Sequence, residues 1–217
     1  GLPNDMRGSA ELNAGAGTLN GQTFDSLQTL VNFDGTLVNV EKFEARFGEG
    51  LLTANGFYRT DSESFIAQIK GRAVPVSRLI AFFPKNSAVP SAEGTVNVDL
   101  TAEGEANDTS SYEIEFSGNG TGIVLNGNSF GQVAFSGTTT GSTLNARLVT
   151  SVGGSEQIVT ATADLGRPEV PFRAETTLTN TPLGPFIALF RKPSPDEVSL
   201  DGRATGRIGF AGDLVSR

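Results

Sequence analysis

Paired carboxylates are the side chains in this sequence whose type and spacing come closest to catalytic machinery. Histidine and cysteine are both absent, which excludes a Ser-His-Asp triad, a thiolate nucleophile and imidazole metal ligands. The closest acids are the pairs Glu41/Glu44, Asp99/Glu103 and Glu113/Glu115. The last pair alternates with apolar residues, so we interpret it as the solvated side of an amphipathic strand and not as a glycosidase pair.

Two further motifs resemble ligand-binding loops and lack the features such loops need. The stretch "GAGTLNG" (15–21) is rich in glycine, but no helical pattern and no lysine follow it, as a phosphate-binding loop requires. The stretch "PSPDEVSLDG" (193–202) carries three acids without the spacing of a calcium loop. We therefore expect no enzyme activity, no metal and no cofactor.

Composition narrows the class of protein further. The 217 residues carry a net charge of −8, and an acidic chain repels phosphate backbones, so we expect no nucleic-acid partner. The chain has 27 glycines and only 18% charged residues, a profile typical of β-proteins outside the cytoplasm. No run of 18 apolar residues is present, so we expect no membrane-spanning helix in these residues.

Most of the chain alternates apolar and polar residues, which predicts strands with one buried face. Turn signals such as Asp34-Gly35, Asn55-Gly56, Asn119-Gly120 and Gly153-Gly154 separate the runs and predict an antiparallel meander. The predicted fold is mainly β, with consecutive strands paired antiparallel in a sheet. We expect its apolar face to be lined by Phe43, Phe47, Phe65, Ile69, Val96, Val98, Leu100, Ile114, Phe116, Leu144, Leu148, Phe172, Ile208 and Phe210.

Two segments change to a helical period. Apolar residues there follow the spacing i, i+3, i+4, i+7, which predicts short amphipathic helices near 75–83 and 182–190. The two stripes are Val76, Leu79, Ile80 and Phe83, and Leu183, Phe186, Ile187 and Phe190. Each stripe has two interpretations: it closes one end of a hydrophobic core, or it lines an apolar groove and contacts acyl chains.

The helices belong to a longer internal repeat. Residues 65–85 match residues 172–192 at 7 of 21 positions, where chance would give about one. Flanking segments align at nearly the same offset, "NGQTF" (20–24) with "NGNSF" (126–130), and 93–104 with 201–212. We therefore predict two modules, 1–104 and 105–217, in one continuous structure cut from a longer array. The segment 8–15 reads as the closing strand of a preceding module.

The repeat resembles the AsmA/TamB superfamily. The resemblance lies in "NFDGTLVNVEKFEARFGEGLLTANG" (32–56) and in "FRAETTLTNTPLGPFIALF" followed by "VSLDGRATGRIGFAGDL". It implies that the antiparallel sheet is long and curved and forms a half-open trough, called a β-taco, with an apolar interior. It also implies a periplasmic segment of a protein anchored in the inner membrane of a Gram-negative envelope, with phospholipid as cargo and an outer-membrane barrel of the TamA type as partner.

Three functions stay open at this point. The apolar face can carry phospholipid between the two membranes, or the sheet edge can assist the assembly of outer-membrane proteins. The third alternative is a structural β-solenoid fragment with a fully packed interior. Many residues expected to point inward are small, among them Ala45, Ala67, Ala146 and Ala174. Small residues leave room for a ligand, but they also suit a tightly curved sheet.

Overall fold

The structure is a computed structural model, and it describes residues 7–19, 22–80, 91–125, 127–184 and 202–214. Nearly all of these residues lie in strands. The first half of the chain holds β1 (Arg7–Ala14), β2 (Gly17–Leu19), β3 (Gln22–Phe24), β4 (Ser26–Asp34), β5 (Leu37–Phe47), β6 (Gly50–Arg59), β7 (Ser64–Pro75), α1 (Val76–Ile80) and β8 (Ala92–Glu105). The second half holds β9 (Asp108–Leu125), β10 (Asn128–Ser129), β11 (Val133–Thr140), β12 (Thr143–Val152), β13 (Ser155–Asp164), β14 (Pro171–Pro182) and β15 (Arg203–Asp213).

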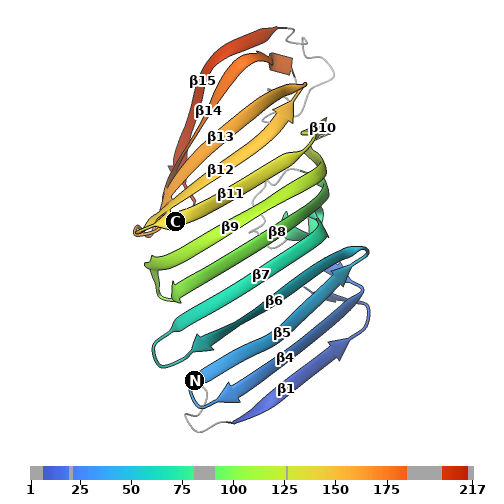
Figure 1. The fold of residues 1–217 in the computed structure, drawn as a ribbon, viewed down its shortest axis with the longest axis vertical. Helices are drawn as coiled ribbons and strands as arrows, with labels where there is room; N and C mark the ends of the chain where they lie inside the picture. The colour runs from blue at the N-terminus through green and yellow to red at the C-terminus, as the bar shows by residue number, and fades with distance from the viewer. Residues whose placement is uncertain (1–6, 20–21, 81–90, 126, 185–201, 215–217) are drawn as a thin grey trace.

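The described strands form one large antiparallel sheet that is not closed. Its order is β1-β4-β5-β6-β7-β8-β9-β11-β12-β13-β14-β15, with β10 paired to β9 and with β2 and β3 in a separate hairpin. The strands succeed one another along the long axis of the molecule, from β1 at one end to β15 at the other (Figure 1). The predicted mainly-β class and the antiparallel meander are therefore confirmed for the described residues.

Cross-strand register divides the sheet into an apolar and a polar face. Directly opposed residues in antiparallel strands point to the same side, so each row of partners stays on one face. The row that we call the apolar row is Leu12, Thr29, Phe43, Ala54, Ile69, Leu100, Phe116, Gly137, Ala146, Ala161, Ala174 and Phe210. The next row, displaced by one residue, is Asn13, Gln28, Glu44, Thr53, Lys70, Asp99, Ser117, Ser136, Arg147, Thr160, Glu175 and Gly209.

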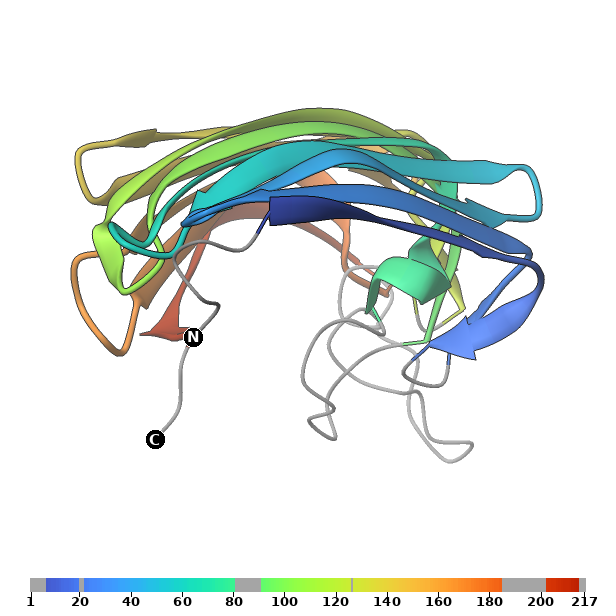
Figure 2. The same cartoon turned by 90° about the horizontal axis from the view of Figure 1, so that it is seen from below.

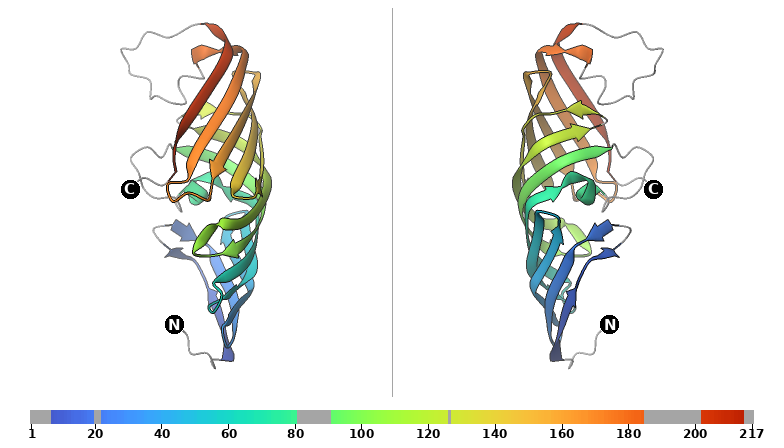
Figure 3. Two further views of the ribbon diagram at one scale, coloured as in Figure 1. Left: turned by 90° about the vertical axis from the view of Figure 1, so that its left-hand side faces the viewer. Right: turned by 90° about the vertical axis from the view of Figure 1, so that its right-hand side faces the viewer.

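The sheet bends toward its apolar side. Figure 2 shows the strands as an arch with α1 beneath it, and Figure 3 shows the same curvature from both sides. Val76 of α1 packs against a small cluster built on Ile123 and Phe130, together with Val96 and Val133. Because Val96 lies on the same face as the apolar row, that face is the concave one. We call it the inner face and the opposite one the outer face.

The backbone repeats the irregularities of the first half in the second half. Four described residues other than glycine have positive φ, and they form two pairs at the offset of the sequence repeat: Glu63 with Val170, and Ala73 with Asn180. Ala73 and Asn180 lie in bulges near the ends of β7 and β14. Each bulge donates its free N–H to a side chain of the next strand, Ala73 to Asn97 Oδ1 (2.9 Å) and Asn180 to Thr205 Oγ1 (3.1 Å).

Several local predictions need correction. Gly153-Gly154 forms the expected turn, and Gly35 also lies in a turn, but its turn partner is Thr36 because Asp34 ends β4. Asn55-Gly56 and Asn119-Gly120 lie inside β6 and β9. Both of these glycines face inward where a neighbouring strand or side chain approaches closely; a Cβ at Gly120 would lie 2.8 Å from the Ile123 side chain. The segment 8–15 does not close a preceding module, because β1 pairs with β4 as β9 pairs with β11.

The predicted helices are described only in part. Residues Val76–Ile80 form the short helix α1, and helical geometry also begins at residues 183 and 184. Phe83, Phe186, Ile187 and Phe190 of the predicted stripes lie outside the described residues, and so do the side chains of Leu79 and Ile80. In the described part of the chain, no helix has the length and hydropathy needed to cross a membrane.

Candidate functional site: the inner face

The inner face holds every residue that the sequence predicts to line the apolar side of the sheet. Register places Phe43, Ile69, Leu100, Phe116 and Phe210 in the apolar row. The other nine predicted residues lie in neighbouring rows of the same face: Phe47, Phe65, Val96, Val98, Ile114, Leu144, Leu148, Phe172 and Ile208. The prediction succeeds because successive side chains of a strand point to opposite faces, so every second residue of an uninterrupted strand lies on the same face.

These side chains are only partly covered. Thirteen of the fourteen are half-buried and Phe210 is 42% exposed. The buried apolar residues among those described are few: Ala45, Val74, Ala92, Ile123, Phe130, Ala163 and Leu178. A closed sandwich would bury its inward Phe, Leu and Ile residues almost completely. Within the described residues, the inner face is therefore a long apolar surface with incomplete cover.

Glycines shape this surface by lying beneath aromatic rings. A Cβ at Gly137 would lie 2.5 Å from the ring of Phe116, and a Cβ at Gly118 would lie equally close to the ring of Phe135. Phe116 and Phe135 also contact each other, with ring centroids 6.4 Å apart. Each ring therefore covers a glycine of the adjacent strand, where a larger residue would collide with it.

A polar patch interrupts the inner face near the start of the second predicted helix. It consists of Thr150, Gln157, Thr176 and Thr181, all of them buried. The Gln157 side-chain amide donates to Thr181 Oγ1 at 2.8 Å, and Thr150 Oγ1 donates to the Phe130 carbonyl at 2.8 Å. The sequence did not predict this patch, because Thr and Leu can both occupy the alternate positions that face inward. Only the pairing of the strands shows which of the polar residues are covered.

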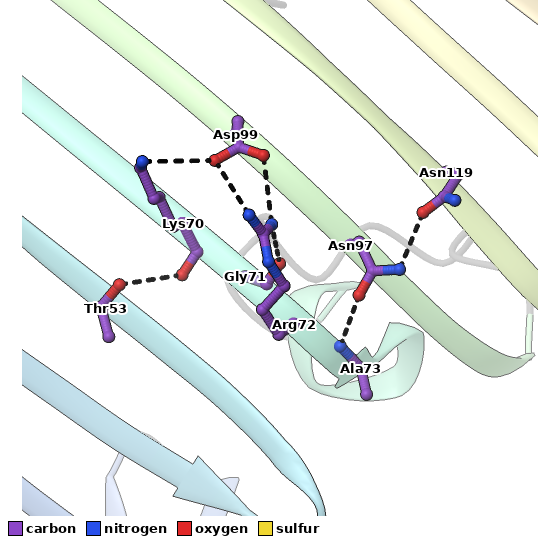
Figure 4. Close-up of polar contacts among 8 residues, drawn as sticks. All are labelled: Thr53, Lys70, Gly71, Arg72, Ala73, Asn97, Asp99 and Asn119. Carbon is purple, nitrogen blue, oxygen red and sulfur yellow. Dashed lines mark hydrogen bonds and ion pairs between the residues drawn. The ribbon is translucent and has the colours of Figure 1, made fainter.

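The outer face carries a ladder of polar contacts across β6, β7, β8 and β9 (Figure 4). Asp99 accepts from Arg72 at 3.1 Å and lies 3.9 Å from Lys70 Nζ. Asn97 bridges the bulge at Ala73 and the side chain of Asn119, to which it donates at 2.8 Å. All three charged groups are about half exposed, so the ladder adds little stability and mainly keeps this face hydrated.

The candidate acids also lie on the outer face. Glu113 and Glu115 stand opposite Glu103 and Thr101, at the edge of a shallow depression of about 790 Å³. All of these side chains are exposed. The described residues contain no group of three or more acids that could hold a metal ion. At the β6–β7 turn, a hydrogen bond from Thr36 lowers the pKa of Asp61.

The inner face gathers apolar side chains that can contact a ligand, and it does not gather reactive groups. No nucleophile with an adjacent base lies on the inner face, because its described polar groups are hydroxyls and one amide. Comparison of the chain with protein-family models, curated proteins and solved structures finds no match.

Proposed function

We propose that this chain is a segment of a periplasmic, envelope-spanning protein whose inner face shields acyl chains of phospholipids in transit between the inner and outer membranes. The observation that carries the proposal is the apolar row, which crosses twelve successive strands with one polar residue, Thr29. The proposal treats the arched sheet as a half-open trough. Its length along the row is roughly 50 Å at the usual strand spacing.

The driving force for loading is the removal of hydrocarbon from water. Each buried CH₂ group contributes about 0.8 kcal/mol, so several methylenes against the partly exposed inner face give useful affinity without a specific polar contact. The headgroup would stay at the open side, in water. Such a surface binds acyl chains of different length with similar strength per methylene, which suits a carrier of mixed phospholipids.

The inner face favours lipid over the two alternatives. Assistance to outer-membrane protein assembly, alone or with a TamA-type barrel, would use backbone groups at a sheet edge and makes no demand on an apolar interior. A packed structural β-solenoid would need the inward Phe and Leu side chains to be fully covered. Their partial exposure supports a face that has room for a ligand.

Site-specific photocrosslinking tests the proposal. A photoreactive amino acid at Leu148 lies on the inner face, while the same group at Val149 lies one residue along β12 on the outer face. We expect phospholipid to be captured at position 148 and not at position 149 when the protein is produced in cells with a Gram-negative envelope. Capture of protein strands at 148 would support the assembly function, and equal lipid capture at both positions would refute the inner-face proposal.

A further inference from the structure

We propose that the polar patch of the inner face binds a hydroxyl group on the acyl chain of a lipid. The patch consists of the buried residues Thr150, Gln157, Thr176 and Thr181. The inference rests on the proposed function and narrows it, since it names a class of cargo, lipids with a hydroxylated acyl chain. Two observations lead to it: the exchange of apolar for polar residues between the two modules, and two buried oxygens without a hydrogen-bond partner.

The first half of the patch replaces an apolar pair of the first module. The turn that joins β5 to β6 corresponds to the turn that joins β12 to β13 in the second module. Counted from these turns, Ala45 corresponds to Thr150, and Leu52 corresponds to Gln157. Ala45 and Leu52 face each other across their strands, as Thr150 and Gln157 do. The same cross-strand pair is therefore apolar in one module and polar in the other.

The second half of the patch shows the same exchange on the next strand. The sequence repeat aligns Ile69 of β7 with Thr176 of β14, and Val74 with Thr181. The bulges agree with this alignment, since Val74 and Thr181 each follow the register shift of their strand. All four positions of the patch are thus apolar in the first module and polar in the second.

Folding of the sheet does not explain this exchange. Ala45 and Val74 are as deeply buried as Thr150 and Thr181, so the fold accepts apolar side chains at these positions. A buried polar group costs free energy unless a hydrogen bond compensates it. Four such groups together on one face indicate a site that recognises a polar group.

Two oxygens of the patch have no hydrogen-bond partner among the described residues, Gln157 Oε1 and Thr176 Oγ1. Gln157 is 2% exposed and Thr176 is 5% exposed, so bulk water does not satisfy them. The other polar groups are paired: Gln157 Nε2 donates to Thr181 Oγ1, and Thr150 Oγ1 donates to the Phe130 carbonyl. The patch therefore offers a ligand one amide acceptor and one hydroxyl.

These two groups match a hydroxyl. Gln157 Oε1 requires a donor, which an ester carbonyl, an ionised phosphate and a hydrocarbon chain all lack. Thr176 faces Val159, two residues beyond Gln157, so Gln157 and Thr176 are diagonal neighbours with Cα atoms about 7–8 Å apart. One ligand hydroxyl between them can donate to Oε1 and accept from the Thr176 hydroxyl. A ligand has to displace the present cover of both oxygens, and the two new hydrogen bonds offset that cost.

The surroundings of the patch favour a hydroxyl on the chain over one in the headgroup. Thr176 lies in a row with Val159 and Ile208, and the buried Leu178 follows it on β14. None of the described inward residues of β12, β13 and β14 is charged. A phosphate or an ammonium group would therefore enter the patch without a counter-charge, which is costly. A hydroxyl on the chain reaches the patch while the headgroup stays in water.

Two probes that differ in one hydroxyl group test the proposal. Stearic acid and a hydroxystearic acid with a mid-chain hydroxyl each displace a fluorescent fatty acid, which gives two dissociation constants. The variant Gln157→Leu/Thr176→Ile introduces the residues of the first module at these two positions. We expect the ratio of the two constants to shift roughly tenfold against hydroxystearic acid, because its hydrogen bonds are lost. Affinity for stearic acid should change little.

The matched control removes two hydroxyls from the outer face of the same strands. Thr160 and Thr177 are exposed there, opposite Glu175 and Arg207, and Thr160→Val/Thr177→Val should leave the ratio unchanged. The single variant Thr176→Val keeps the shape of the side chain and should shift the ratio several-fold in the same direction. It serves as the test if circular dichroism shows the double variant to be unfolded.

The outcomes separate this proposal from the lipid function itself. An unchanged ratio in the folded variants would overturn the proposal and leave the lipid function standing, because the patch would then have only a structural role. An equal shift in the outer-face control would overturn it as well. If the unaltered protein bound neither stearic acid nor hydroxystearic acid, the lipid function would be refuted, and this proposal with it.

Discussion

The lipid proposal is tested most sharply by a charge placed on the inner face beside a matched charge on the outer face. Leu148 lies in β12 between Phe135 and Val159, where an acyl chain following the inner face would cross it. We expect Leu148→Arg to lose binding because the guanidinium keeps water in the path of the chain. If about three methylenes lose apolar contact at about 0.8 kcal/mol each, the loss is about 2.4 kcal/mol, or roughly 60-fold in Kd.

The control is Val149→Arg, one residue further on and facing outward. Leu148 and Val149 are both half-buried, so each replacement costs about 1 kcal/mol of folding stability or less. Equilibrium titration with a fluorescent fatty acid measures the difference, and urea unfolding checks that the two variants are equally stable. Unchanged affinity in Leu148→Arg, or an equal loss in Val149→Arg, would show that acyl chains do not use the inner face.

Three predictions concern the stability of the sheet itself. Gly137→Ala should destabilise by about 1–3 kcal/mol, because its Cβ would lie 2.5 Å from a phenyl ring, whereas Gly206→Ala has open space and should be neutral or slightly stabilising in thermal unfolding. Thr181→Val should cost about 1–3 kcal/mol in urea unfolding, since it leaves the buried Gln157 amide without its acceptor. Asp99→Asn removes two exposed ion pairs and should change stability by less than about 1 kcal/mol, so a larger loss would contradict the assignment of that ladder to hydration.

The sequence predicted the faces of the sheet much better than its turns. Alternation over Phe43, Ala45 and Phe47, or over Leu144, Ala146 and Leu148, is a local signal, and it assigns each side chain to a face without knowledge of the neighbours. Asn55-Gly56 and Asn119-Gly120 failed as turns because the same dipeptide serves two purposes. A glycine is needed at a hairpin, and it is needed equally where another strand or a ring comes too close for a Cβ.

The bulges and the polar patch could not be read from the sequence. Ala73 adopts positive φ in a bulge whose N–H is accepted by Asn97 on the next strand, and a partner 24 residues away leaves no mark on the local pattern. The burial of Gln157 likewise depends on its contact with Thr181 across the strand pair. Alternation identifies which side of the sheet a residue occupies, whereas the extent of its cover depends on long-range packing.

The apolar row has a geometric consequence for any array built from this repeat. Cross-strand pairing places Ile69 of the first module and Ala174 of the second in the same row. The sequence repeat, in contrast, aligns Ala174 with Ala67, two residues before Ile69. Each module is thus sheared against the previous one by two residues, roughly 7 Å along the strands. Stacked in succession, such units would turn the inner face gradually about the long axis, so that a molecule moving along it would rotate as it advanced.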